Sequence, residues 1–149
     1  ARANGQWRDI DGQQVLVVFQ GPQAYVSPSF YETKRETGKV VPTWNYAMVQ
    51  VRGVARLRAD PDWLGKQIEA LTTRHEKGRT PSWAVSDAPR AYIESQLRGI
   101  VGIEIEIAAI EGKWKVSQNR PEADRRGVAE GLSQSNPAMA DLVRRFGNI

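Results

Sequence analysis

The chain has 149 residues, the size of one domain, and a chain of this length buries roughly 70% of the surface that it exposes when unfolded. The absence of cysteine excludes disulfides, thiolate zinc sites and a cysteine nucleophile, and is compatible with a reducing cytoplasm. A net charge of +4 favours anionic partners, such as nucleic acid or a phosphorylated cofactor, without selecting one. No apolar run has the length needed to cross a bilayer.

The first part of the chain is expected to form a β-hairpin. Residues 13–21 are rich in β-branched and aromatic residues and end at Gly21-Pro22, which predicts a buried strand stopped by a turn. Residues 23–27 then predict a second strand, which Pro28 ends. The polar residues that follow, 29–41, predict a loop.

Residues 45–58 predict a long, half-buried strand, because apolar and polar residues alternate along them. We expect this strand to be the central one, with Val49, Val51 and Leu57 facing the core. Asp60-Pro61 then supplies a helix cap followed by a proline at the first helical position. The predicted helix carries a stripe at helical spacing, made of Leu64, Ile68, Leu71 and His75, and ends at Gly78.

The second half is expected to add two strands and three helices. A helix is predicted over residues 88–97, followed by a strand on which Ile103, Ile105 and Ile107 form one dry side. Glu111-Gly112 predicts a tight turn into a last strand, residues 113–117. Helices over about 121–132 and 137–146 are predicted to pack as an αα-hairpin.

These elements predict an α+β fold that is mainly β. About five antiparallel strands with flanking helices fit a small barrel better than a doubly wound parallel sheet, because strictly alternating βα units are absent. We expect a single domain over residues 1–149, with the barrel in 13–117 and the helical tail in 121–146.

Few residues suggest catalysis. His75 is the only histidine, which is too few for a zinc site, and its helical stripe favours a packed or capping role. Glu104 and Glu106 alternate with the isoleucines, so we expect them on the surface rather than as an acid and base. No G-x-G-x-x-G or P-loop motif is present. The helical tail presents almost nothing to a base edge, so it is not expected to read DNA.

The remaining candidates are polar and aromatic residues at strand ends. Lysines and hydroxyls that converge suit a phosphate, and flat aromatic rings beside amides suit a heterocycle with donors and acceptors at its edge. The alternative is that they are turn residues and interface aromatics, and the residues alone leave both open. The set consists of Tyr25, Ser27, Ser29, Tyr31, Thr43, Trp44, Asn45, Lys113, Lys115, Ser117, Gln118 and Asn119.

Five phrases carry a family resemblance over nearly the whole chain: FQGPQAYVSPSFY, VVPTWNYAMV, LTTRHE, IVGIEIEI and KWKVSQNR. In these phrases the sequence resembles the PaiB-type family of FMN-binding negative transcriptional regulators. The resemblance implies a split β-barrel related to pyridoxamine-phosphate-oxidase-like flavoproteins, a homodimer, and FMN near the subunit interface. It also implies a further N-terminal segment with a helix and the first barrel strands, and we expect the sequence to begin after that segment and the domain to be truncated.

The resemblance makes the strand-end residues the expected FMN site. We expect Lys113 and Lys115 beside the phosphate, Trp44 and Tyr25 over the isoalloxazine ring, and the Asn45 amide at the edge of that ring. Repression of transcription, with DNA as a partner, follows from the family analogy alone. A flavin-dependent oxidoreductase of the pyridoxamine-phosphate-oxidase-like type is the alternative function.

Overall fold

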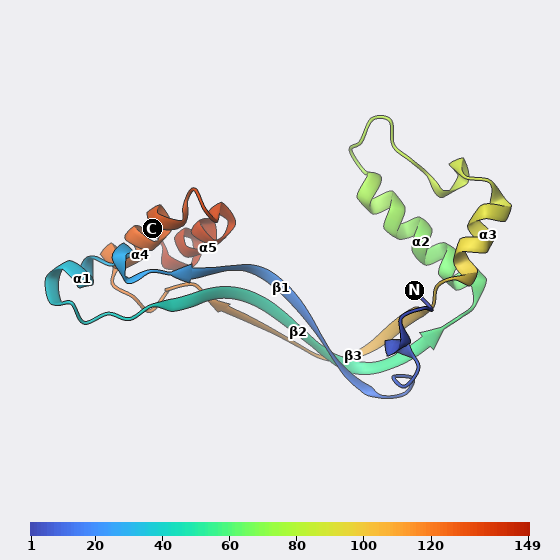
Figure 1. Cartoon of the computed structure of the whole chain (residues 1–149), viewed down its shortest axis with the longest axis horizontal. Helices are drawn as coiled ribbons and strands as arrows, with labels where there is room; N and C mark the ends of the chain where they lie inside the picture. The colour runs from blue at the N-terminus through green and yellow to red at the C-terminus, as the bar shows by residue number, and fades with distance from the viewer. The chain divides into compact units, whose positions relative to one another are not determined.

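Three long β-strands form the scaffold of the protein (Figure 1). The computed structural model describes residues 1–149, in which the strands are β1 (Gln14–Val26), β2 (Thr43–Arg58) and β3 (Gly102–Lys115). They pair antiparallel in the order β1-β2-β3, so β2 is central, as expected, and β1 and β3 are the edges. The antiparallel α+β fold is thereby confirmed. The sheet is open, and closure into a barrel is not confirmed.

Five helices and three short 3-10 turns complete the fold. The predicted helices are present as α2 (Pro61–Glu76), α3 (Arg90–Arg98), α4 (Glu122–Leu132) and α5 (Pro137–Gly147). The Asp60 carboxylate accepts the Trp63 N–H over 3.0 Å and so caps α2 as predicted. The additional elements are α1 (Glu32–Thr37), η1 (Gly5–Trp7), η2 (Pro28–Phe30) and η3 (Val85–Asp87). None of the helices combines the length and the apolar character that crossing a membrane requires.

The chain divides into two compact units. The first unit comprises Ala1–Leu16 and Arg52–Ala109, and includes α2 and α3. The second unit comprises Val17–Val51 and Ile110–Ile149, and includes α1, α4 and α5. Each of the three strands contributes residues to both units.

The second unit has the larger apolar core. Helices α4 and α5 pack against each other, which confirms the predicted αα-hairpin, and they cover the buried ends of β1 and of the segment after β3. On β2 the predicted burial of Val51 is confirmed, whereas Val49 and Leu57, also expected to face the core, are only partly buried. The core cluster comprises Ala24, Val26, Tyr31, Val116, Val128, Ala129, Leu132, Met139, Ala140 and Val143.

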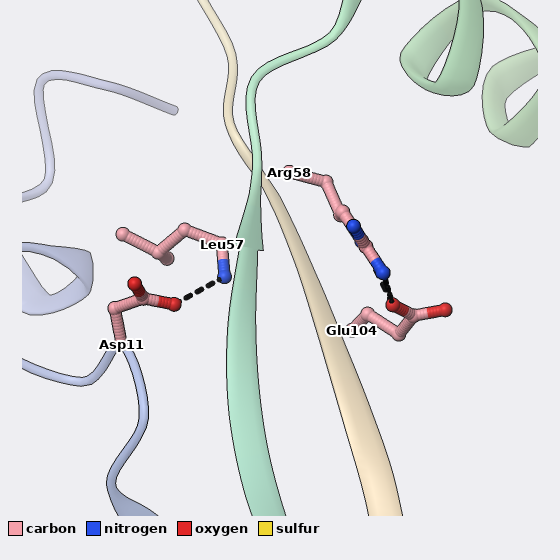
Figure 2. Close-up of polar contacts among 4 residues, drawn as sticks. All are labelled: Asp11, Leu57, Arg58 and Glu104. Atoms are coloured by element: carbon pink, nitrogen blue, oxygen red, sulfur yellow. Dashed lines mark hydrogen bonds and ion pairs between the residues drawn. The ribbon is translucent and has the colours of Figure 1, made fainter.

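The first unit buries less of its helices. Leu64 of α2 is buried, whereas Leu71 is exposed and the His75 side chain is exposed rather than packed, so the expected apolar stripe covers only the first turns. Figure 2 shows two polar contacts of this unit: the Asp11 carboxylate accepts the Leu57 N–H over 2.9 Å, and Arg58 pairs with Glu104. Both partners of the ion pair are about half exposed, which agrees with a surface role for Glu104.

Two predicted turns are wrong, because the strands run straight through them. β1 continues through Gly21-Pro22 and is an edge strand of the sheet. An edge strand tolerates a proline, because a proline nitrogen that faces away from the neighbouring strand removes no hydrogen bond between the strands. β3 continues through Gly112, where a Cβ would lie 2.3 Å from Cζ3 of Trp114. The glycine therefore makes room for the Trp114 ring instead of forming a turn, and the structure has three strands rather than about five.

The prediction that one face of β3 is buried is also wrong for the chain taken alone. Ile103 is 46% exposed and Ile107 is 57% exposed, and Ile105 is only partly buried. The alternation of apolar and acidic residues was correctly identified, but no helix of the first unit covers this face of the open sheet. Apolar residues of β3 are therefore left in contact with solvent.

Candidate functional site

All of the predicted site residues lie in the second unit, on β1, β2 and β3 and in the segments that follow β1 and β3. The structure brings most of them together in pairs, each formed by residues of neighbouring strands or of one turn. The pairs differ in burial. This difference separates residues that can reach a ligand from residues that hold the fold.

The first pair is aromatic and exposed. Tyr25 on β1 is 50% exposed and Trp44 on β2 is 54% exposed, and their ring centroids lie 6.1 Å apart at 72°. An edge-to-face pair of this kind is favourable, yet both rings keep apolar surface in contact with water. The pair therefore offers flat aromatic surface to a ligand or to another chain.

The second pair is polar and also exposed. The Lys115 ammonium on β3 donates to Thr43 Oγ1 on β2 over 2.5 Å. Lys113, two residues earlier on β3, is likewise exposed. These two lysines are cations that an anion can approach from solvent.

The third pair is buried. Asn45 is 1% exposed, and its amide donates to Ser117 Oγ over 2.9 Å. Ser117 is itself buried and has φ of 65°, a left-handed conformation that is uncommon for residues other than glycine. The structure thus places the Asn45 amide inside the unit with a protein partner, rather than at the surface with the aromatic pair.

The remaining predicted residues make local contacts or none. The hydroxyls of Ser27 and Ser29 lie 2.7 Å apart, and Ser27 caps η2 by accepting the Ser29 N–H. Gln118 bonds the backbone at both ends of its amide, to the N–H of Val116 and the carbonyl of Trp114. Asn119 is exposed, and its side chain makes no hydrogen bond within the protein.

Tyr31 is the most buried aromatic residue of the set. The Arg120 guanidinium carbon lies 4.7 Å from its ring centroid, which is a cation–π geometry. Its hydroxyl is buried without a hydrogen-bond partner. Burial raises the pKa of this hydroxyl above 10.0, the nearby Arg120 cation acts in the opposite direction, and the Asp124 carboxylate adds to the rise.

A hollow on the second unit was missed by sequence reasoning. It has a volume of about 630 Å³ and is lined by Tyr46, Met48, Gln50, Glu111, Gly112 and Lys113, of which only Lys113 was predicted. The residues from β2 are those that alternate with the buried ones, so the period-2 pattern could have placed them on one face. The pattern carried no sign that this face is hollowed.

Comparison with known proteins identifies the family. The profile of the family described as "Putative FMN-binding domain" matches residues 1–109. The chain belongs to this FMN-binding family of PaiB type. FMN is accordingly its cofactor.

Three curated relatives are similar over most of the chain. An uncharacterized protein of Emericella nidulans is 43% identical over 152 residues, covering 91% of this chain and 60% of that protein. An uncharacterized protein of Aspergillus fumigatus is 40% identical over 156 residues, with the same coverage of 91% and 60%. The "Protease synthase and sporulation protein PAI 2" of Bacillus subtilis is 37% identical over 148 residues, covering 96% of this chain and 69% of that protein. The chain thus spans about 60% of the length of the two fungal relatives.

The chemistry of the second unit fits FMN. A phosphate monoester requires a cation that it can approach, and the exposed lysines supply it. An isoalloxazine ring requires flat apolar surface, which the exposed Tyr25–Trp44 pair supplies. Lys113 also lines the hollow on this unit, so a cation and a concave surface occur together there.

Proposed function

We propose that this chain is an FMN-binding regulatory protein that acts as a homodimer and lowers transcription. The regulatory part is supported by the name of the Bacillus subtilis relative, which refers to protease synthase and sporulation rather than to a reaction. The FMN site is proposed at the strand ends of the second unit. The predicted single domain, with its barrel over residues 13–117, remains part of the same proposal.

The observation that carries the FMN site is the exposure of the Tyr25–Trp44 pair in the same unit as the exposed lysines Lys113 and Lys115. Large aromatic side chains usually bury most of their surface in a folded protein. Two rings that are each about half exposed and already in contact with each other are therefore suited to binding a flat partner. When bound, FMN supplies reversible one- and two-electron transfer.

A homodimer with a closed barrel is supported by the apolar residues that the open sheet leaves uncovered. Ile103 and Ile107 belong to the first unit, and Phe19 and Ile110 belong to the second. Both outer strands also have an unpaired backbone edge, which favours pairing with a further strand. Light scattering of the protein and of Ile107→Lys tests the dimer, because a charge at a buried interface is expected to shift the population to monomer.

Flavin titration tests the proposed site. We expect Lys115→Met and Trp44→Ala each to weaken FMN binding about ten- to a hundredfold, which corresponds to the loss of one charge-assisted or stacking contact. Lys39→Met removes an exposed lysine of the same unit, and Tyr92→Ala removes an exposed aromatic residue of the first unit. These two controls are expected to bind FMN like the parent. Affinities within a factor of two of the parent for both test variants would exclude this placement.

A separate experiment distinguishes regulation from catalysis. DNA binding that is specific for one sequence and persists above about 200 mM salt supports the regulator, because binding driven only by phosphates weakens steeply with salt. Oxidation of a nicotinamide nucleotide that requires FMN, saturates, and disappears in Trp44→Ala would instead establish the oxidoreductase. Neither outcome depends on the other.

A further inference from the structure

The turn that follows β3, residues 117–120, has an unusual backbone. Ser117 has φ of 65°, a conformation that costs free energy in a residue with a Cβ. The turn is closed by a hydrogen bond of 3.0 Å from the Arg120 N–H to the Ser117 carbonyl. A residue in a strained conformation persists only where its surroundings hold it in place. The contacts of this turn therefore identify the residues that hold Ser117 in its left-handed conformation.

Three side chains, two from outside the turn and one from within it, hold the turn in place. Asn45 fixes the Ser117 hydroxyl in the interior. The Gln118 amide accepts the Val116 N–H over 2.7 Å and donates to the Trp114 carbonyl over 2.6 Å, which ties the turn back to the end of β3. The Arg125 guanidinium donates to the Arg120 carbonyl over 2.7 Å. The backbone of the turn is therefore organised before any ligand binds.

What remains free in this rigid turn is a set of hydrogen-bond donors. The backbone N–H groups of Gln118 and Asn119 donate to no acceptor in the protein, and the exposed Asn119 side chain has no partner. Lys113, Lys115 and Arg120 lie within a few residues, and residues 112–121 contain no acidic side chain. Successive free backbone N–H groups suit an anion, and the three cations add positive charge to the same stretch of chain.

We propose that the 117–120 turn holds a phosphate monoester, through the backbone N–H groups of Gln118 and Asn119 and the Asn119 amide. This inference rests on the proposed FMN site and assigns the phosphate end of the cofactor to the turn. Lys115 supplies the charge from the preceding strand. The Ser117 hydroxyl takes no part, because it is buried with Asn45, and its role is to fix the backbone from which the free N–H groups project.

Comparison of FMN with riboflavin in Asn119→Asp tests this assignment, because the two flavins differ only in the phosphate. Asn119 is exposed and without hydrogen bonds, so the variant is expected to fold normally, which its melting temperature checks. A carboxylate at this position repels a phosphate of charge about −2. By fluorescence titration we expect FMN to bind at least about tenfold more weakly and riboflavin to bind within a factor of two of its affinity for the parent.

Gln134→Glu is the matched control. It adds the same charge at another exposed position of the second unit, between α4 and α5, and is expected to leave the affinity for both flavins unchanged. An equal loss for FMN and riboflavin in Asn119→Asp would overturn the inference, because it would place the turn at the heterocycle. Unchanged FMN affinity would also overturn it. A parent protein that binds neither flavin would overturn the proposed FMN site itself, and this inference with it.

Discussion

The Asn45 amide and the Ser117 hydroxyl form a buried hydrogen bond of 2.9 Å, although 72 positions separate the two residues in the sequence. The bond joins β2 to the turn after β3 and holds Ser117 in its left-handed conformation. The Ser117 hydroxyl also donates to Asn45 Oδ1 over 3.2 Å, and neither side chain makes a hydrogen bond to any other residue. Each of the two polar side chains can therefore be buried because the other satisfies its hydrogen bond.

Replacing Asn45 tests this interdependence. Asn45→Ala leaves the Ser117 hydroxyl buried without a partner, and we expect the free energy of unfolding to fall by about 1–3 kcal/mol. Ser117→Gly breaks the same bond and leaves the Asn45 amide buried without a partner, but it relieves left-handed strain worth about 1 kcal/mol, and we expect its loss to be reduced by that amount. Urea unfolding followed by tryptophan fluorescence measures both. Equal stability of Asn45→Ala and the parent would show that the pair contributes nothing.

Val51 tests the register of β2. Its side chain is buried, so Val51→Asp places an unpaired carboxylate in the interior, and we expect a loss of more than about 3 kcal/mol or failure to fold. Arg52→Asp is the control, because Arg52 points to the opposite, exposed side, where a substitution should cost no more than about 0.5 kcal/mol. Similar denaturation midpoints for the two variants would mean that the assigned faces are wrong.

The burial of Val51 was predictable because a period-2 pattern fixes the two faces of a strand wherever one of them is buried. Helix α2 was predictable for a similar reason, since the Asp60 cap and Pro61 are local signals. The continuity of β1 and β3 was not predictable. Gly21-Pro22 and Gly112 are turn signals in isolation, and only the edge position of β1 and the neighbouring Trp114 ring explain them.

The candidate site was predictable only in part. The strand-end residues were found because polar and aromatic side chains cluster in the sequence, and the structure places all of them in one unit. The sequence could not show that Trp44 is exposed and able to reach a ligand whereas Asn45 beside it is buried. The burial of each residue depends on which residue of β3 or of its turn lies opposite, and for Asn45 that residue is Ser117. Their roles toward FMN therefore stay predictions.

Gly127 tests the packing of α4 against η2. A Cβ at this position would lie 2.0 Å from the Phe30 carbonyl oxygen, so Gly127→Ala forces the backbone apart. We expect a loss of about 1–3 kcal/mol. Gly65→Ala is the matched control, since a Cβ in the middle of α2 meets nothing within 4 Å and should stabilise the helix by about 0.5–1 kcal/mol. Thermal melts of the two variants should therefore shift in opposite directions.

The buried hydroxyl of Tyr31 predicts a loss of stability in alkali. Its pKa in the folded protein is raised above 10.0, mainly by burial and further by Asp124, and only partly offset by Arg120. The folded state therefore keeps its proton at a pH where the unfolded state releases it, so stability is full below pH 10 and falls as the pH rises above it. Tyr31→Phe should remove this part of the pH dependence.

At pH 7 the same variant should be as stable as the parent or slightly more stable, because the lost hydroxyl has no hydrogen-bond partner. Urea midpoints measured from pH 7 to 11 for both proteins check the two expectations, and a clear loss at pH 7 would show that the hydroxyl is satisfied by a group such as a bound water.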